Sequence, residues 1–158
     1  RYSATRMVEE YSKKFYQKAS NNFSLYARNN FENANIVADW KATVKKLWHG
    51  VELRQLEMPG KNADFGTKLH FKVAIQLNGL KPDDVVVELL LCRQFKKIKL
   101  NKFNHFKFNN SGIDESGEYL FELNLKPELC GRQIYYVRVY PHHQLLSHPL
   151  EMGMMVWL

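Results

Sequence analysis

A chain of 158 residues has the length of one ordinary domain, and its 45% hydrophobic and 13% aromatic content excludes a disordered or collagen-like protein. Its net charge of +7 permits contact with polyanions, nucleic acid included. Its apolar runs fall short of the about 18–20 residues that a transmembrane helix needs, and the amino terminus lacks a signal-peptide pattern, so we expect a cytoplasmic protein.

The first fifty residues carry the periodicity of helices. Behind a cap at Ser3, apolar residues recur at helical intervals, and we expect Asn21 and Asn22 to end this first helix. A second short helix is expected over residues 23–30, and a third ends at His49 and Gly50, a cationic last turn followed by a capping glycine. The apolar stripes contain Ala4, Met7, Val8, Tyr11, Phe15 and Ala19 in the first helix, and Ile36, Val37, Trp40, Val44, Leu47 and Trp48 in the third. We predict about three helices, with the two tryptophans in the core.

From Val51 the apolar period changes to two, which is typical of strands. The expected strands pass through 53–56, 69–77, 85–92, 98–108, 119–125, 134–140 and 152–158, with turn signals at 58–62, 78–84, 109–112 and 115–117. About seven short strands joined by turns predict an antiparallel immunoglobulin-like β-sandwich. The predicted fold class is therefore α+β, with a helical segment at 1–50 and a β-sandwich at 51–158.

Both ends of the chain carry patterns that are typical of one enzyme family. Residues 136–158 contain a strand, the pattern Arg-x-Tyr-Pro, a loop with histidines, a Leu-x-His-Pro step and a final Trp. This segment resembles the closing segment of the bacterial and archaeal α-glucan phosphorylases. Residues 2–11 resemble a late helix of the catalytic domain, where the family reads Phe-Ser/Thr-x-x-Arg-Met-Val-x-Glu-Tyr and this chain has Tyr2 in place of Phe. The strands between the two ends resemble the family only loosely.

The resemblance implies a longer parent enzyme that cleaves α-1,4-glucan with phosphate. Its upstream catalytic domain, the tail of which would be residues 1–50, would hold pyridoxal phosphate as a Schiff base on a lysine. The family's cofactor motif, of the type Gly-Thr-Ser-x-Met-Lys, and its glycine-rich phosphate-binding segment have no counterpart in this sequence. We therefore expect no catalytic and no cofactor-binding residue in this chain, whose start at Arg1 also suggests a piece of something longer.

Cysteines and histidines were weighed as metal ligands. Cys92 and Cys130 lie in apolar contexts without Cys-x-x-Cys or Cys/His spacing, which predicts free thiols in a reducing compartment, with a disulfide across the sandwich as the alternative. His142, His143 and His148 share one loop but lack a further ligand at matching spacing. The sequence therefore predicts no metal site.

Basic and aromatic residues alternate over residues 93–108, a mixture that single-stranded nucleic-acid binders also use. On a strand, however, Lys97 and Lys99 would face one side while Ile98 faces the other, and charged edge positions also prevent aggregation between sheet edges. We favour a solvated sheet edge over contact with nucleic acid or polysaccharide here.

Exposed aromatic rings can stack on sugar rings, and Tyr135, Tyr136 and Trp157 are the candidate glucan contacts. They lie at strand ends where one ring of each alternating pair faces outward. A second, weak glucan site would raise the effective concentration of a long polymer near the catalytic domain.

Two functions remain open at this stage. The first is an accessory, non-catalytic carboxy-terminal part of an α-glucan phosphorylase, in which the helical stripe packs on the upstream catalytic domain. The second is a stand-alone carbohydrate-binding or protein-interaction sandwich. In the isolated chain we expect the stripe either to cause self-association or to form a compact helical cap, and we expect no membrane partner.

Overall fold

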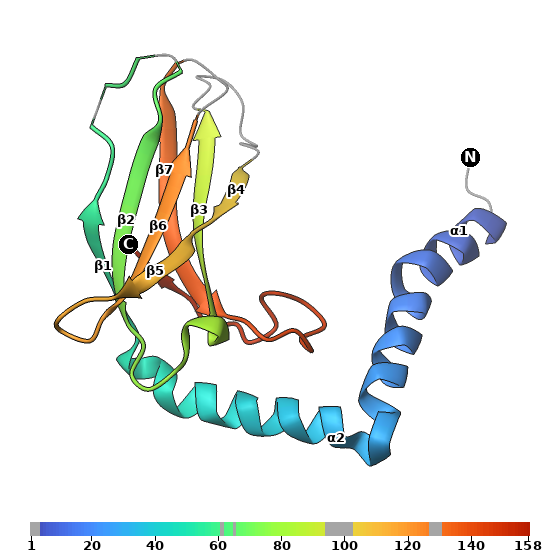
Figure 1. Ribbon diagram of the computed structural model, residues 1–158. Helices are drawn as coiled ribbons and strands as arrows, with labels where there is room; N and C mark the ends of the chain where they lie inside the picture. The colour runs from blue at the N-terminus through green and yellow to red at the C-terminus, as the bar shows by residue number, and fades with distance from the viewer. Residues whose placement is uncertain (1–3, 61, 65, 94–102, 127–130) are drawn as a thin grey trace.

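The structure, a computed structural model, describes residues 4–60, 62–64, 66–93, 103–126 and 131–158. A helical arm leads into a β-sandwich (Figure 1). The arm consists of α1 (Ala4–Tyr11), a π-helical turn (Ser12–Tyr16), α2 (Gln17–Leu47) and a 3-10 turn (Trp48–Gly50). The strands are β1 (Glu52–Glu57), β2 (Leu69–Gln76), β3 (Val85–Arg93), β4 (Asn104–Lys107), β5 (Asn109–Ile113), β6 (Tyr119–Leu125), β7 (Gln133–Pro141) and β8 (Val156–Trp157), with a 3-10 turn (Pro82–Asp84) before β3.

The strands form two antiparallel four-stranded sheets, ordered β1-β2-β6-β5 and β4-β3-β7-β8. In the lettering of immunoglobulin domains, this chain order corresponds to sheets A-B-E-D and C′-C-F-G. The predicted α+β fold, with helices followed by an immunoglobulin-like sandwich, is confirmed. None of the helices in the described part of the chain is long and apolar enough to cross a membrane.

Individual strand predictions differ from the structure at three places. Residues 109–112 were predicted as a turn but lie in β5, an exposed edge strand whose register shifts between Asn110 and Gly112. Gly112 has a φ of 133°, which permits this irregularity. The strand predicted at 98–108 forms at Asn104–Lys107, while residues 98–102 lie outside the described residues. The final strand is limited to Val156–Trp157.

Apolar side chains of both sheets meet between them and form the core. Phe71, Val73 and Ile75 of β2 oppose Val87 and Leu89 of β3, as the period of two predicts. The same cluster contains Phe108, Phe121, Leu123, Leu125, Val137 and Val139, and from the helical segment Val44 and Trp48. The end of α2 is therefore part of the sandwich core.

Polar contacts also attach α2 to one end of the sandwich. The indole N–H of Trp40 donates to Asp84 Oδ1 at 2.7 Å, and the N–H of His142 donates to the carbonyl oxygen of Asp84 at 2.7 Å. Asn78 Nδ2 donates to the carbonyl oxygen of Leu47 at 2.7 Å, satisfying a group at the carboxy end of the helix. The predicted core position of Trp48 is confirmed, and Trp40 is half-buried against the core.

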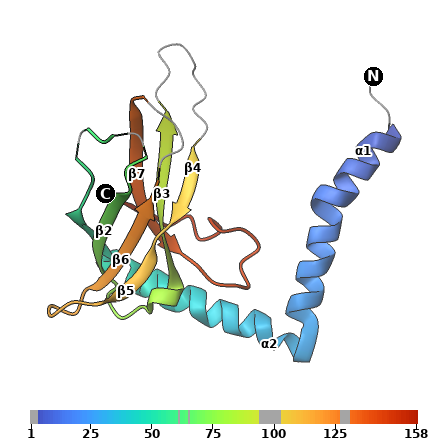
Figure 2. The ribbon, with the colours of Figure 1, turned by 45° about the horizontal axis from the view of Figure 1, so that its top comes forward.

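The predicted helix end at Asn21 and Asn22 is wrong, because α2 continues through both residues. The chain instead bends at residues 29–31, where Asn29, Asn30 and Phe31 have positive φ values of 49°, 54° and 65°. Asparagine tolerates this left-handed conformation better than most residues, so the pair at 29 and 30 is the physical reason for the position of the bend. In both views α1, at the far end of the arm, stands apart from the sandwich (Figure 1, Figure 2).

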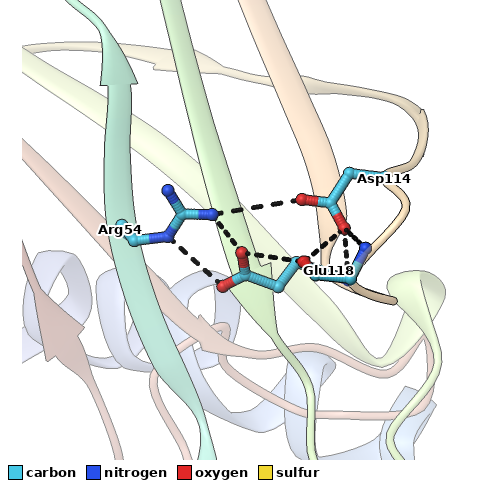
Figure 3. Close-up of polar contacts among 4 residues, drawn as sticks. Arg54, Asp114 and Glu118 are labelled. Carbon is cyan, nitrogen blue, oxygen red and sulfur yellow. Dashed lines mark hydrogen bonds and ion pairs between the residues drawn. The ribbon is translucent and has the colours of Figure 1, made fainter.

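Charged pairs cover the outer face of the sheet β1-β2-β6-β5. Arg54 on β1 reaches across the sheet to the carboxylate of Glu118 and lies 4.0 Å from that of Asp114 (Figure 3). Hydrogen bonds from Ser116, and next from the N–H of Glu118, lower the pKa of Asp114 below its ordinary value. The contacts of Arg54 link the edge strand β1 to the β5–β6 turn. Ion pairs of this kind are typical of a solvated protein surface.

Candidate functional site

The outer face of the sheet β4-β3-β7-β8 differs from the charged outer face of the other sheet. Strand register places Lys107, Glu88, Arg138 and Trp157 in one row across the four strands. His105 and Tyr136 occupy the next row on the same face, opposite Leu90 of β3. This row arrangement brings charged and aromatic side chains from four strands together.

A buried carboxylate lies at the centre of this face. Glu88 is only 5% exposed, and its Oε2 accepts hydrogen bonds from Arg138 Nε at 2.8 Å and Nη2 at 2.6 Å. Its Oε1 lies 3.0 Å from Nδ1 of His105, a half-exposed ring. The Arg138 side chain is 12% exposed. Since both partners are largely removed from water, each depends on the other for its charge to be stable there.

Aromatic rings surround the guanidinium of Arg138. Its Cζ lies 5.3 Å from the ring centroid of Tyr140 and 5.5 Å from that of Trp157, both within cation–π range. Burial, and next the nearby charge of Glu88, raises the pKa of Tyr140. The guanidinium of the Arg138–Glu88 ion pair thus packs against the rings of Tyr140 and Trp157.

Two of these rings are exposed to solvent. Tyr136 is 46% and Trp157 50% exposed, and their ring centroids lie 6.4 Å apart with an interplanar angle of 87°. Phe103 continues the series, at 6.1 Å from Tyr136 and an angle of 64°. We call Phe103, Tyr136 and Trp157, together with His105 and Arg138, the aromatic face.

The three candidate glucan contacts therefore separate into two sets. Tyr136 and Trp157 come together on the aromatic face. Tyr135 lies on the opposite side of β7, where it is paired with Leu91 and its ring meets the edge of Phe71 at 5.4 Å. Successive residues of a strand point to opposite faces, so Tyr135 cannot join this surface.

Sequence reasoning missed Glu88, Arg138 and His105 as members of one cluster. The signal for Glu88 was available, because it is the one charged residue in the apolar run of residues 85–92. A charged residue in such an apolar run predicts a buried partner of opposite charge. That partner, Arg138, lies on a strand about fifty residues later, and the sequence of the run does not reveal which strand pairs with it or in which register.

The histidine loop after β7 packs against α2. The ring of His143 lies 5.0 Å from that of Trp40, and Tyr26 donates a hydrogen bond to the carbonyl oxygen of Leu145. His143 and His148 each accept a backbone N–H two residues later, so both rings stabilise turns. Among the described residues, no group of three or more His, Cys, Asp and Glu is placed to hold a metal ion.

The remaining sequence predictions on cysteines and on the basic run are tested only in part. Cys92 is buried in β3, whereas Cys130 lies outside the described residues. Most of the basic run, residues 94–102, also lies outside them. The thiol state and the solvated edge stay predictions.

The amino-terminal arm carries the second unusual surface. No residue of α1 or of the following π-helical turn is buried, although Met7, Tyr11 and Phe15 project large apolar side chains. The rings of Tyr11 and Phe15 lie 5.6 Å apart on one stripe. These three side chains therefore do not pack on the sandwich, unlike Val44 and Trp48 at the other end of the helical segment. We call Met7, Tyr11 and Phe15 the arm stripe.

The geometry defines the chain as an antiparallel β-sandwich with a helical arm, an aromatic face on one sheet and an exposed apolar stripe on the arm. Comparison with protein families is specific: residues 48–158 match the model described as the glycogen phosphorylase C-terminal domain. The chain therefore belongs to the glycogen phosphorylase C-terminal domain family, and it is homologous to the carboxy-terminal part of α-glucan phosphorylases.

Curated relatives extend the match over nearly the whole chain. Maltodextrin phosphorylase of Thermococcus litoralis is 32% identical over 99% of this chain, and glycogen phosphorylases of Mycobacterium bovis and Mycobacterium tuberculosis are 28% identical over 96%. The chain spans about a fifth of the length of these relatives, 18% in each case. A comparison with solved structures gave no significant match.

Proposed function

We propose that this chain acts as the accessory carboxy-terminal module of an α-glucan phosphorylase and has no catalytic activity alone. Family membership supports this, as does the absence from the sequence of the cofactor-lysine motif and the glycine-rich phosphate segment that the resemblance implies for the parent enzyme. Pyridoxal phosphate then belongs to the catalytic part of the parent. The two cysteines, without redox or metal spacing, fit a cytoplasmic setting.

The observation that carries the proposal is the unpaired arm stripe on a helix whose other end is built into the sandwich core. Met7, Tyr11 and Phe15 are all about half exposed or more, and burying such side chains on a partner stabilises each by roughly 1.5–3 kcal/mol relative to water. In our proposal the partner is the catalytic part of the same enzyme. The hydrogen bonds of Trp40 and Asn78 hold α2 on the sandwich, so a partner that binds the arm is also joined to the sandwich.

The first test is enzymatic. The 158-residue chain, incubated with maltoheptaose and phosphate, is expected to release no glucose-1-phosphate and to show no absorbance from a pyridoxal Schiff base. Stoichiometric bound cofactor, or phosphorolysis above the buffer rate, would contradict the proposal.

The second test is physical. When its partner surface is absent, the arm stripe is expected to cause concentration-dependent self-association in light scattering. Tyr11→Ser with Phe15→Ser should abolish it, because both substitutions replace exposed apolar rings. Ile113→Ser, which removes an exposed apolar side chain from β5 instead, serves as the control and should leave association unchanged. If the unsubstituted 158-residue chain stays monomeric at all concentrations, this result would count against the arm stripe as a docking surface.

A stand-alone carbohydrate-binding sandwich remains the second candidate function, favoured by the aromatic face alone. The two candidates differ in the expected size of the native polypeptide.

A further inference from the structure

We infer that the aromatic face binds a curved, α-linked glucan chain, with Tyr136 and Trp157 stacking on sugar rings and with the half-exposed His105 available to its hydroxyl groups. This inference rests on the proposed function, from which the glucan substrate class is taken. It assigns a ligand to one outer face of the sandwich and none to the other.

The contrast between the two outer faces is the first argument. On the sheet β1-β2-β6-β5, partly exposed ion pairs such as Lys72 with Glu122, at 2.8 Å, are ordinary surface contacts. On the sheet β4-β3-β7-β8, a buried carboxylate and guanidinium lie beneath half-exposed rings. Since burying an ion pair seldom adds stability compared with an apolar pair, its presence under an exposed surface fits a role in positioning that surface.

The charge of the aromatic face selects the class of ligand. Arg138 donates twice to Glu88, and His105 lies within hydrogen-bond distance of the same carboxylate. The carboxylate thus compensates the charge of Arg138, and this buried guanidinium offers little attraction to a polyanion such as nucleic acid. A neutral polymer whose rings have apolar C–H faces and whose rims carry hydroxyl groups matches exposed aromatic rings beside polar side chains.

The angles between the rings select the linkage. Trp157 is turned by 87° from Tyr136, and Tyr136 by 64° from Phe103, so no two neighbouring rings form one flat platform. A β-1,4-glucan is a flat ribbon and requires nearly coplanar rings. An α-1,4-glucan turns from one sugar to the next, and its successive residues can meet rings that are inclined to one another.

The experiment is calorimetric titration of the 158-residue chain with maltoheptaose and, separately, with cellohexaose. We expect weak binding of maltoheptaose and at least tenfold weaker binding of cellohexaose. Trp157→Ala and Tyr136→Ala should each weaken maltoheptaose binding by about tenfold, as expected for loss of one aromatic stacking contact. Tyr136→Phe and Trp157→Phe keep a ring and should retain most of the affinity, which separates loss of stacking from loss of folding.

Matched controls keep the outcome interpretable. Ile113→Ala removes an exposed apolar side chain from the opposite sheet and should leave affinity unchanged. Equal binding of the two sugars, or retention of full affinity by both alanine variants, would overturn the inference, as would no heat with either sugar at millimolar concentration. The proposed function has independent tests in the enzymatic and scattering measurements. If those succeed while glucan binding fails, the inference alone is wrong.

Discussion

Removing the carboxylate of Glu88 should destabilise the sandwich strongly. Glu88→Leu leaves the guanidinium of Arg138, 12% exposed, without its two charge-assisted hydrogen bonds. Breaking a buried ion pair from one side costs about 3–5 kcal/mol. The rings of Tyr140 and Trp157 still face the cation, so we expect the lower part of that range, about 3 kcal/mol. A domain with a total stability of roughly 5–15 kcal/mol remains folded but unfolds at clearly lower denaturant concentration.

The double substitution distinguishes a buried ion pair from simple loss of packing. Glu88→Leu with Arg138→Met replaces two charges by apolar side chains, and such replacements are commonly neutral or stabilising. We therefore expect the double variant to regain most of the stability that Glu88→Leu loses. The assay is urea denaturation of all four proteins of the cycle, followed by circular dichroism. Additive losses, or a loss below about 1 kcal/mol for Glu88→Leu alone, would refute the reasoning.

Four further changes test other parts of the structure. Trp40→Phe removes an N–H donor to a carboxylate and should lower the free energy of unfolding by about 1.5–3 kcal/mol. Gly50→Ala places a Cβ 2.4 Å from Nδ2 of Asn78 and should cost about 1–3 kcal/mol. Asn30→Gly relieves a left-handed backbone and should raise the stability of the bent helix by up to about 1 kcal/mol, whereas Asn30→Ala should lower it. Burial, and next the charges of Lys107 and His143, lowers the pKa of His142, so stability should be complete above the unfolded value of about 6.5 and fall as the pH decreases through it.

A simple result would contradict each of these predictions. Denaturation midpoints equal to that of the unsubstituted protein would refute the predictions for Trp40→Phe and Gly50→Ala. Equal effects of glycine and alanine at position 30 would refute the prediction for Asn30. For the pH dependence, His142→Gln is the control, since it should remove part of the loss of stability between about pH 6.5 and the lowered pKa. A variant with the same pH profile as the parent would show that His142 does not contribute.

The parts of the fold that depend on local pattern were predictable from the sequence. The period of two identified β2, β6 and β7, because each has one face in the core and alternates accordingly. The stripe with Val44 and Trp48 identified a helix face that is buried. Here local pattern and tertiary environment agree.

The parts that depend on strand pairing were not predictable. β5 has a turn-like composition and becomes a strand because its backbone pairs with β6. Alternation indicated that one of Tyr135 and Tyr136 faces outward, but only the pairing of β7 with β3 decides which. The cluster of Glu88, Arg138 and His105 exists only once three strands are in register.

The helical arm illustrates a third limit. Asn21 and Asn22 resemble a helix end, yet the helix continues through them and bends at Asn29 and Asn30. Two asparagine pairs of similar composition thus have different outcomes. Asn33 near the second pair donates across the bend to the carbonyl oxygen of Leu25 at 2.9 Å, a contact eight residues apart that a local pattern does not reveal.

The central claim is that this chain works as one part of a larger phosphorylase, and the size of the native polypeptide tests it most directly. An antibody raised against the 158-residue chain would be used to isolate the native protein from its source cells for intact mass measurement and assay. We expect a polypeptide several times the chain's 18.7 kDa, with bound pyridoxal phosphate and with phosphorolysis of maltoheptaose. A native protein of about 18.7 kDa without either property would contradict the claim and leave the stand-alone binding sandwich as the function.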